Sequence, residues 1–225
     1  MDLPGEWLGS SWIAAGWALT VIALVAAAWR APWFHLRNPA DVSAWLAGLC
    51  ITLAIWQIRA ELPEGGHLHL IGAAVLTYMF GWAFALIGLA AVVAAHVLAH
   101  GQPWTTIAPA YVAVALMPVV AARLWAMAIE RWLPKNIFVY LIAGGFAAGA
   151  FSVIVSAFVV VFCIDLAGAL TRHMLYELYR PYLLLAAFPE AFTGGFLLAI
   201  FVVYRPQWVM SFDDRRYLRP PRGSA

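Results

Sequence analysis

The sequence has few charged residues, and this shortage excludes a soluble globular domain. Charged residues make up 11% of the 225 residues and hydrophobic residues 65%, whereas a soluble domain carries about 25% charged residues. The mean hydropathy is +0.86. A soluble protein of this composition would lack the polar side chains needed to cover its surface. Twelve Trp and eight Tyr suit a protein with two membrane interfaces.

Cysteine is nearly absent, which argues against a disulfide framework. Cys50 and Cys163 each lie in an apolar run without a Cys-x-x-Cys neighbour, and we interpret both as small buried hydrophobic residues. The net charge of +2 is too small to indicate nucleic-acid binding. Asp2 and Glu6 but no Lys or Arg precede the first apolar run. This is not the basic start of a signal peptide, so we expect the N-terminus to be retained.

Motifs of catalysis and nucleotide binding are also missing. The sequence contains no Gly-x-Ser-x-Gly, no His-Glu-x-x-His, no Walker loop and no Gly-x-Gly-x-x-Gly. We therefore expect no enzyme and no prosthetic group. If the chain moves a solute uphill, another subunit or an ion gradient must supply the energy. An intramembrane enzyme with a histidine metal site is a weaker hypothesis, because no acid–base pair has suitable spacing.

Long apolar stretches dominate what is present. A spanning helix needs about 20 mostly apolar residues, and seven stretches come close to this length. The sequence therefore predicts an all-α, polytopic membrane bundle that forms a single domain over residues 1–225. The third stretch is short, and only Gly81 and Trp82 separate it from the fourth, which predicts a tight helical hairpin. The stretches are 10–29, 43–59, 67–81, 83–100, 106–128, 138–164 and 182–204.

Basic residues predict the orientation of the bundle, because Lys and Arg concentrate on the cytoplasmic side. Nine lie on the side of the C-terminus, where residues 205–225 form a basic tail, and three lie on the other side. We expect a cytoplasmic C-terminus, with the N-terminus and loops 60–67, 100–106 and 165–181 facing outward. The nine are Arg30, Arg37, Arg131, Lys135, Arg205, Arg215, Arg216, Arg219 and Arg222; the three are Arg59, Arg172 and Arg180.

Four histidines form two clusters on the predicted outer side. His96 and His100 are spaced i, i+4 and share a helix face. This spacing can chelate a metal, or it can place two imidazoles at the interface with water and headgroups. His67 and His69 are two residues apart, so on a helix at most one faces the interior. His69 lies in an apolar run and needs a polar partner there, as a ligand or through a structural hydrogen bond.

Two further ionisable residues lie at membrane depth. Arg123 interrupts an apolar run, and we expect its side chain to reach the cytoplasmic interface. Glu190 follows Pro189 at the start of the last predicted span. Its carboxylate could form an ion pair, line a polar path or accept a hydrogen bond from a loop.

Three segments together resemble a known family, the cobalt- and nickel-specific substrate-binding components of energy-coupling factor transporters (the CbiM/NikM-like group). The first is MDLPGEWL at residues 1–8, which is similar to the family's start. The second is LPEGGHLHLIG at 62–72, which matches a Gly-Gly…His-Leu-x-Gly pattern. The third is PEAFT at 189–193, followed by YRP at 204–206. The segment FDDRRYL at 212–218 resembles a divergent proteobacterial branch of the group.

The resemblance implies a metal site and partners. In the family the N-terminus folds back into the bundle, here residues 1–9. The amine of Met1, the backbone nitrogen of Asp2 and the imidazole of His69 would then bind one divalent metal. Family members carry His where this chain has Asp2, so His67, or His96 and His100, could complete a different ligand set. The metal would be Co, Ni, Zn or Cu.

The resemblance also implies a multi-pass protein in lipid of a bacterial inner membrane. It would be the permease component that works with an ATPase pair and a transmembrane coupling subunit. The alternative is an accessory or structural subunit of a larger membrane complex that has lost transport.

Overall fold

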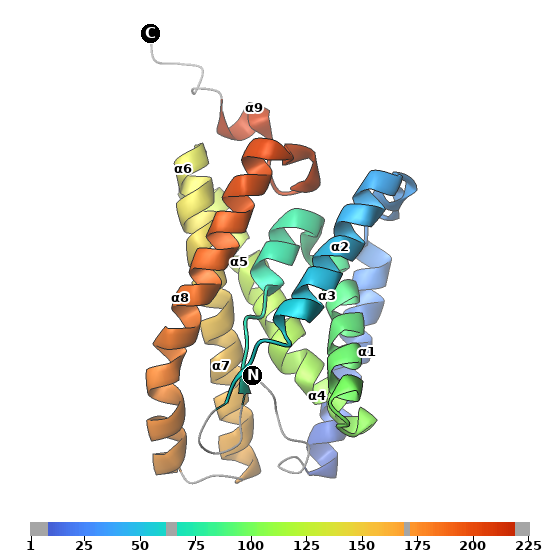
Figure 1. Ribbon diagram of the computed structural model, residues 1–225, viewed down its shortest axis with the longest axis vertical. Helices are drawn as coiled ribbons and strands as arrows, with labels where there is room; N and C mark the ends of the chain where they lie inside the picture. The colour runs from blue at the N-terminus through green and yellow to red at the C-terminus, as the bar shows by residue number, and fades with distance from the viewer. Residues whose placement is uncertain (1–8, 62–66, 169–171, 219–225) are drawn as a thin grey trace.

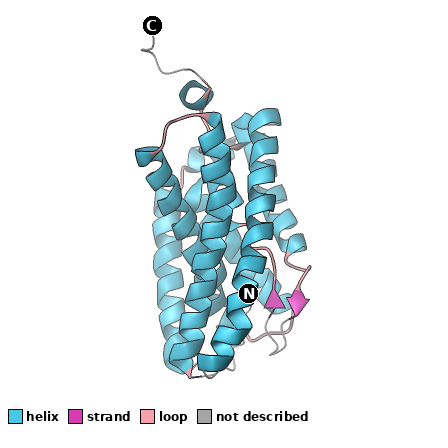
Figure 2. Cartoon of the chain, turned by 90° about the vertical axis from the view of Figure 1, so that its left-hand side faces the viewer, coloured by secondary structure: helices cyan, strands magenta, loops and turns pink. Residues whose placement is uncertain are grey.

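The computed structural model is a bundle of helices that run mostly along one axis (Figure 1). It describes residues 9–61, 67–168 and 172–218. The predicted all-α membrane fold is confirmed, because nearly all regular structure in these ranges is helical (Figure 2). The exception is one short antiparallel ladder, in which Ala60 pairs with Leu68 and Glu61 with His67.

The bounds of the elements follow the chain. The long helices are α1 (Ser10–Arg30), α2 (Pro39–Ile55), α3 (Ala73–Ala99), α5 (Met117–Trp132), α7 (Ala147–Ala167) and α8 (Arg172–Tyr204). The short elements are η2 (Trp33–Arg37), β1 (Ala60–Glu61), β2 (His67–Leu68), η3 (Trp104–Thr106), α4 (Ile107–Tyr111), η4 (Val112–Leu116), α6 (Ile137–Val139), η5 (Tyr140–Phe146), η6 (Pro206–Trp208) and α9 (Asp214–Tyr217).

Among the described residues, five helices are long and apolar enough to cross a membrane. The helix α2, with 17 residues, is shorter. The stretches expected at 67–81 and 83–100 fall within α3, which is not one rod. Gly81 interrupts it with φ 79° and ψ 158°, a conformation that is essentially restricted to glycine.

The interruption at Gly81 reverses the chain direction, as the contact between His69 and His96 shows. These residues lie at opposite ends of the segment, yet their ring centroids are 5.6 Å apart. A straight helix of 27 residues would be about 40 Å long and would keep them apart. The predicted hairpin is confirmed. Its first arm, from Ala73 to Phe80, is almost wholly buried.

The last predicted span begins too late. Residues 165–181 were expected to form an outer loop, but α7 continues to Ala167 and α8 already starts at Arg172. Pro189 and Glu190 therefore lie inside α8 and not at its start. The cause is that hydropathy marks where a helix leaves the apolar layer, and helical backbone can continue beyond that point.

Close contact between α7 and α8 depends on glycine. A Cβ placed on Gly149 would lie 2.7 Å from the carbonyl oxygen of Glu190. Such close backbone contact is the usual way for helices to associate in lipid, where apolar side chains gain little from leaving the bilayer. The contact fixes the height of Glu190 in the bundle.

The expectation that both cysteines are buried is wrong for Cys50. It is exposed on α2, and Cys163 is partly buried; neither forms a disulfide. The reason is that the outer surface of a membrane bundle faces hydrocarbon, so an apolar run does not imply burial in protein. Most of α1 is exposed in the same way.

The elements that carry most of the described basic residues of the two groups lie at opposite ends of the bundle. The end of α1 and the starts of α2 and α6 lie at the same end as the end of α8 (top of Figure 1), whereas α8 begins at the other. Part of the predicted tail is folded against this end: Met210 N–H donates to Met79 O at 2.8 Å and Ser211 N–H to Tyr78 O at 3.2 Å. These carbonyls lack helical partners because Gly81 interrupts α3.

Candidate metal site

The candidate site is built on the short segment that joins β2 to α3. His69 is 8% exposed, and Ile71 and Ala73 are fully buried. The chain therefore enters the bundle here as irregular backbone. Such backbone is tolerated at membrane depth only where protein or a polar cavity surrounds it. Its amides and carbonyls must then find partners on neighbouring helices.

Glu190 on α8 provides two of these partners. Its Oε2 accepts a hydrogen bond from Ile71 N–H at 2.7 Å, and its Oε1 accepts one from Gly72 N–H at 2.6 Å. Glu190 is only 4% exposed. Of the three roles considered for this residue, the structure shows the hydrogen bond to a loop. Bonds of this kind to a carboxylate are short and strong in a low-dielectric setting.

Gly72 makes this double bond possible. Its φ of 71° lies in the left-handed region, where a side chain costs about 1–2 kcal/mol. This turn brings the two consecutive amides to the same carboxylate and leads directly into α3, for which Gly72 is the N-cap residue.

Trp56, just beyond the end of α2, holds the same segment from another side. Its indole N–H donates to Ile71 O at 3.2 Å, and its ring centroid lies 4.6 Å from that of His69. Trp56 is 1% exposed. The imidazole of His69 is thus positioned by α2 and α8 together, although it belongs to neither.

A further hydrogen bond determines which nitrogen of His69 can bind a metal. Nδ1 lies 3.1 Å from Leu70 O. A carbonyl only accepts, so Nδ1 carries a proton, and in the neutral imidazole the lone pair is on Nε2. Ligating histidines commonly bind a carbonyl through the other ring nitrogen in this way.

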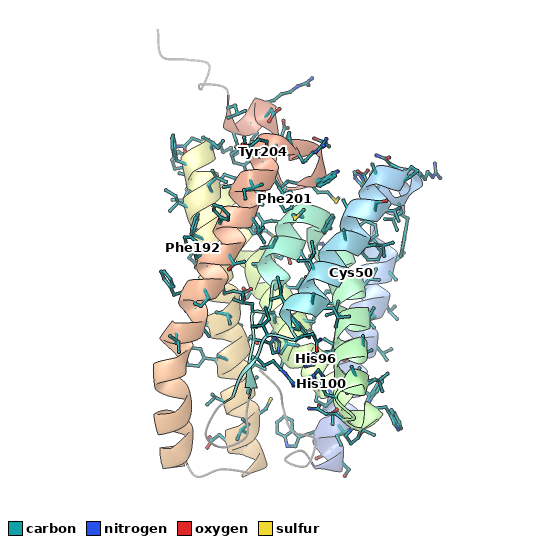
Figure 3. All side chains as sticks on the ribbon, viewed as in Figure 1. Cys50, His96, His100, Phe192, Phe201 and Tyr204 are labelled. Atoms are coloured by element: carbon teal, nitrogen blue, oxygen red, sulfur yellow. The ribbon has the colours of Figure 1, made fainter. Side chains whose placement is uncertain are left out.

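His96 and His100 lie beside this position at the end of α3 (Figure 3). The rings of His96 and His100 are 4.4 Å apart, and that of His96 is 5.4 Å from Trp56. His96 is 4% exposed, and His100 Nδ1 donates to His96 O at 2.8 Å. The expected shared face is therefore present, and it packs against His69.

The structure brings together only part of the predicted ligand set. Met1 and Asp2 lie outside the described residues, and of His67 only the backbone in β2 is described. Within 9–61, 67–168 and 172–218, no group of three or more His, Cys, Asp or Glu side chains is arranged to hold a metal ion. The ligand set with Met1, Asp2, His67 and His69 stays a prediction.

Arg123 lies in a different part of the bundle from the histidines of the candidate site. Its side chain is exposed and lines a small cavity of about 160 Å³ with Tyr78, Glu130 and Ser211. Tyr78 and Ser211 belong to the end of the bundle that carries the C-terminal segment. Arg123 therefore lies at the end of the bundle that carries the C-terminal segment, and that its side chain reaches the cytoplasmic interface stays a prediction.

The sequence reasoning missed Trp56 and Gly72. Trp56 was one of twelve tryptophans and nothing in its neighbourhood distinguished it. Gly72 had a usable signal, because a glycine directly before an apolar helix, after a histidine motif, indicates a sharp entry of the chain.

Comparison with known proteins identifies a family that covers nearly the whole chain. Residues 3–208 match the family described as the cobalt uptake substrate-specific transmembrane region. The chain belongs to this family. The match includes β2, His69, Gly72 and Glu190, so the described part of the site lies within the matched range, whereas Met1 and Asp2 precede it. No protein of curated function matches the chain.

Two crystal structures share the fold. One, of a truncated transition metal transporter, has 20% sequence identity and a TM-score of 0.73, and the match covers 90% of this chain and 98% of the other. The second, of a transition metal transporter, has 19% identity and a TM-score of 0.70, with 96% of both chains covered. The arrangement of helices is therefore that of known membrane proteins.

Proposed function

We propose that this member of the cobalt uptake family binds a divalent transition metal at His69 and is the membrane substrate-binding component of an energy-coupling factor-type uptake system. The observation that carries the proposal is the fixed position of His69. It is a buried imidazole on irregular backbone, which Glu190 of α8 holds at Ile71 and Gly72 and which Trp56, just beyond α2, holds at Ile71. A polar loop of this kind inside a membrane bundle indicates a binding site.

The remaining ligands would come from the N-terminus. The amine of Met1 and the backbone nitrogen of Asp2 would join Nε2 of His69, as the family resemblance implies, with His67 as a further candidate. Nitrogen ligands in a near-planar arrangement favour Ni²⁺ or Cu²⁺, while a contribution from the Asp2 carboxylate would shift the preference toward Co²⁺ or Zn²⁺. His96 and His100 are weaker candidates that could complete the set from α3.

The route of the metal follows from the predicted orientation. The metal would enter from the side of the N-terminus and leave at the end with the basic residues. The chain has no phosphate-binding loop, so an ATPase pair and a transmembrane coupling subunit would supply the energy. The location would be the inner membrane of a bacterium.

Metal analysis of the purified protein tests the proposal. The protein must carry its native N-terminus, and bound Co, Ni, Zn and Cu are quantified by inductively coupled plasma mass spectrometry. We expect about one metal per chain, with loss in His69→Ala and in a variant with residues added before Met1.

His35→Ala is the matched control, because it also removes an imidazole but lies in η2 at the opposite end of the bundle. Equal metal content in the wild type, His69→Ala and the extended variant would contradict the site. Metal binding without uptake in cells that hold the partner subunits would instead favour the accessory-subunit alternative.

A further inference from the structure

A groove of about 570 Å³ opens sideways between α2 and α8. The first arm of α3 lies between these two helices in Figure 1 and contributes to the walls. Phe201 lies on the side of α8 that faces the groove, and Phe192 on the other side (Figure 3). The volume is within the usual range of small-molecule sites. Its walls include Ala44, Ala47, Val75, Met79, Leu197 and Phe201.

The groove is apolar even where polar residues line it. Ser43 donates its hydroxyl to Pro39 O and Thr52 to Gly48 O, each at 2.8 Å. Both oxygens of Glu190 are bound to the loop amides. These groups therefore offer little to a polar ligand, and an apolar occupant fits the walls.

The groove is long and narrow enough for an acyl chain. On α2 its lining extends from Ala40 to Ile55, a distance of about 22 Å along the helix. One leaflet of the hydrocarbon layer is about 15 Å deep, half of a core of about 30 Å. The groove is therefore longer than one leaflet is deep, so a single lipid tail could lie along it through the whole depth of that leaflet.

One end of the groove carries positive charge. Trp208 lines that end, and the guanidinium carbon of Arg205 lies 5.5 Å from the centroid of its ring. Arg205 is exposed. The nearby Asp41 lines an adjoining hollow and accepts a hydrogen bond from Asn38 Nδ2 at 3.1 Å. This end belongs to the side with the excess of Lys and Arg, where anionic lipids are enriched.

We propose that this groove binds one acyl chain of an anionic phospholipid, with the phosphate held at Arg205. A tail gains little by leaving one apolar medium for another. The charge at the headgroup therefore selects the lipid, while the groove fixes its position. At its inner end the tail would contact Ile71 and Gly72, so the lipid would support the segment that carries His69.

Retention of lipid by the purified protein tests this. The protein is equilibrated with equal amounts of phosphatidylglycerol and phosphatidylcholine in detergent, and bound lipid is counted by native mass spectrometry. We expect one phosphatidylglycerol per wild-type chain. Ala47→Phe fills the groove from an exposed position and should abolish this adduct. Ile51→Trp, also on the groove wall, provides a second variant if Ala47→Phe does not fold.

Cys50→Phe is the matched control, because it adds the same ring on the same helix outside the groove and should retain the lipid. Arg205→Gln should remove the preference for phosphatidylglycerol, whereas Arg215→Gln on α9 should keep it. Unchanged retention of phosphatidylglycerol in the folded groove variants would overturn the proposal.

Crosslinking in native membranes tests the other possible occupant of the groove. If Ala47→Cys crosslinked to a co-purifying polypeptide, the groove would belong to a partner helix and the lipid proposal would be wrong. None of these measurements depends on bound metal.

Discussion

The carboxylate of Glu190 and the amide of Gly72 are joined by a hydrogen bond of 2.6 Å between residues that are 118 positions apart in the sequence. Together with the bond to Ile71 N–H, this contact fixes the entry of the chain into the bundle to the middle of α8. Any movement of α8 relative to α3 must therefore displace the segment next to His69 or break both bonds.

Replacing Glu190 with Gln should loosen this segment. The amide side chain keeps one acceptor, but its NH₂ group would face a backbone N–H. Loss of a hydrogen bond to a charged group typically costs about 1.5–3 kcal/mol. We expect a lower midpoint of thermal unfolding in detergent and weaker metal retention.

Glu130→Gln is the control for Glu190→Gln. Glu130 lies 3.5 Å from Arg216, and both side chains are about one-third exposed. Exposed ion pairs contribute about 0–1 kcal/mol, so this variant should change little. If the two variants were equally stable and held equal metal, Glu190 would have no positioning role.

The Gly72→Ala variant should lose stability through backbone strain and not through steric crowding of the added Cβ. A Cβ on Gly72 would lie 3.7 Å from the Thr52 side chain, which is ordinary contact. The cost is therefore conformational and should be about 1–2 kcal/mol. Gly101→Ala is a matched control, because Gly101 also has positive φ and has no atom within 4 Å of an added Cβ.

Both glycine variants should lose similar stability in denaturation experiments. Only Gly72→Ala should weaken metal binding in a competition assay with a chelating dye. Equal metal affinity in the two variants would show that the geometry of Gly72 does not matter for the site.

The hairpin could be predicted from the sequence, whereas the hydrogen-bond partners of Glu190 could not. The short spacer at Gly81 and Trp82 was enough to predict the reversal, because residues 67–100 are too many to form one span in a bilayer of normal thickness. The partner of Glu190 could not be derived, since it is a pair of backbone amides. Every residue type has much the same backbone, so composition and periodicity cannot predict which amides a side chain will bind. Only the three-dimensional path of the chain shows these partners.

The burial of the cysteines and the start of α8 could not be predicted from hydrophobicity. Hydrophobicity identifies the residues that avoid water, but it does not distinguish protein neighbours from lipid. Cys50 therefore appeared to be buried and is exposed. Likewise, the start of α8 at Arg172 lies before the apolar stretch, where hydropathy carries no signal for helix.

Trp56 should report the binding of a metal at His69. Open-shell ions such as Co²⁺, Ni²⁺ and Cu²⁺ quench a nearby indole, and Trp56 lies 4.6 Å from the imidazole between ring centroids. We expect metal-dependent quenching of the tryptophan fluorescence in the wild type and a smaller change in Trp56→Phe. Trp125→Phe is the control, because it also loses an indole hydrogen bond, to Ala143 O at 2.8 Å, but lies elsewhere. Equal quenching in both variants would exclude a metal beside Trp56.

Ser211 should contribute to stability through the carbonyls that Gly81 leaves free. Its hydroxyl donates to Tyr78 O at 2.7 Å, so it accepts the hydrogen of Tyr140 O–H at 2.6 Å. Ser211→Ala leaves the buried Tyr140 hydroxyl without its acceptor, which should cost about 1–3 kcal/mol. Tyr140→Phe removes the hydroxyl itself and should cost less.

The double variant tests whether these groups act as a unit. With both hydroxyls removed, no buried donor is left unsatisfied, so the loss should be smaller than the sum of the two single losses. The measurement is the free energy of unfolding of all four proteins in one detergent. Additive losses would mean that the hydroxyls act independently and that Ser211 supports the C-terminal segment only through its bonds to Tyr78. A coupled loss would show that the segment after α8 is held to the broken end of α3 by a connected network.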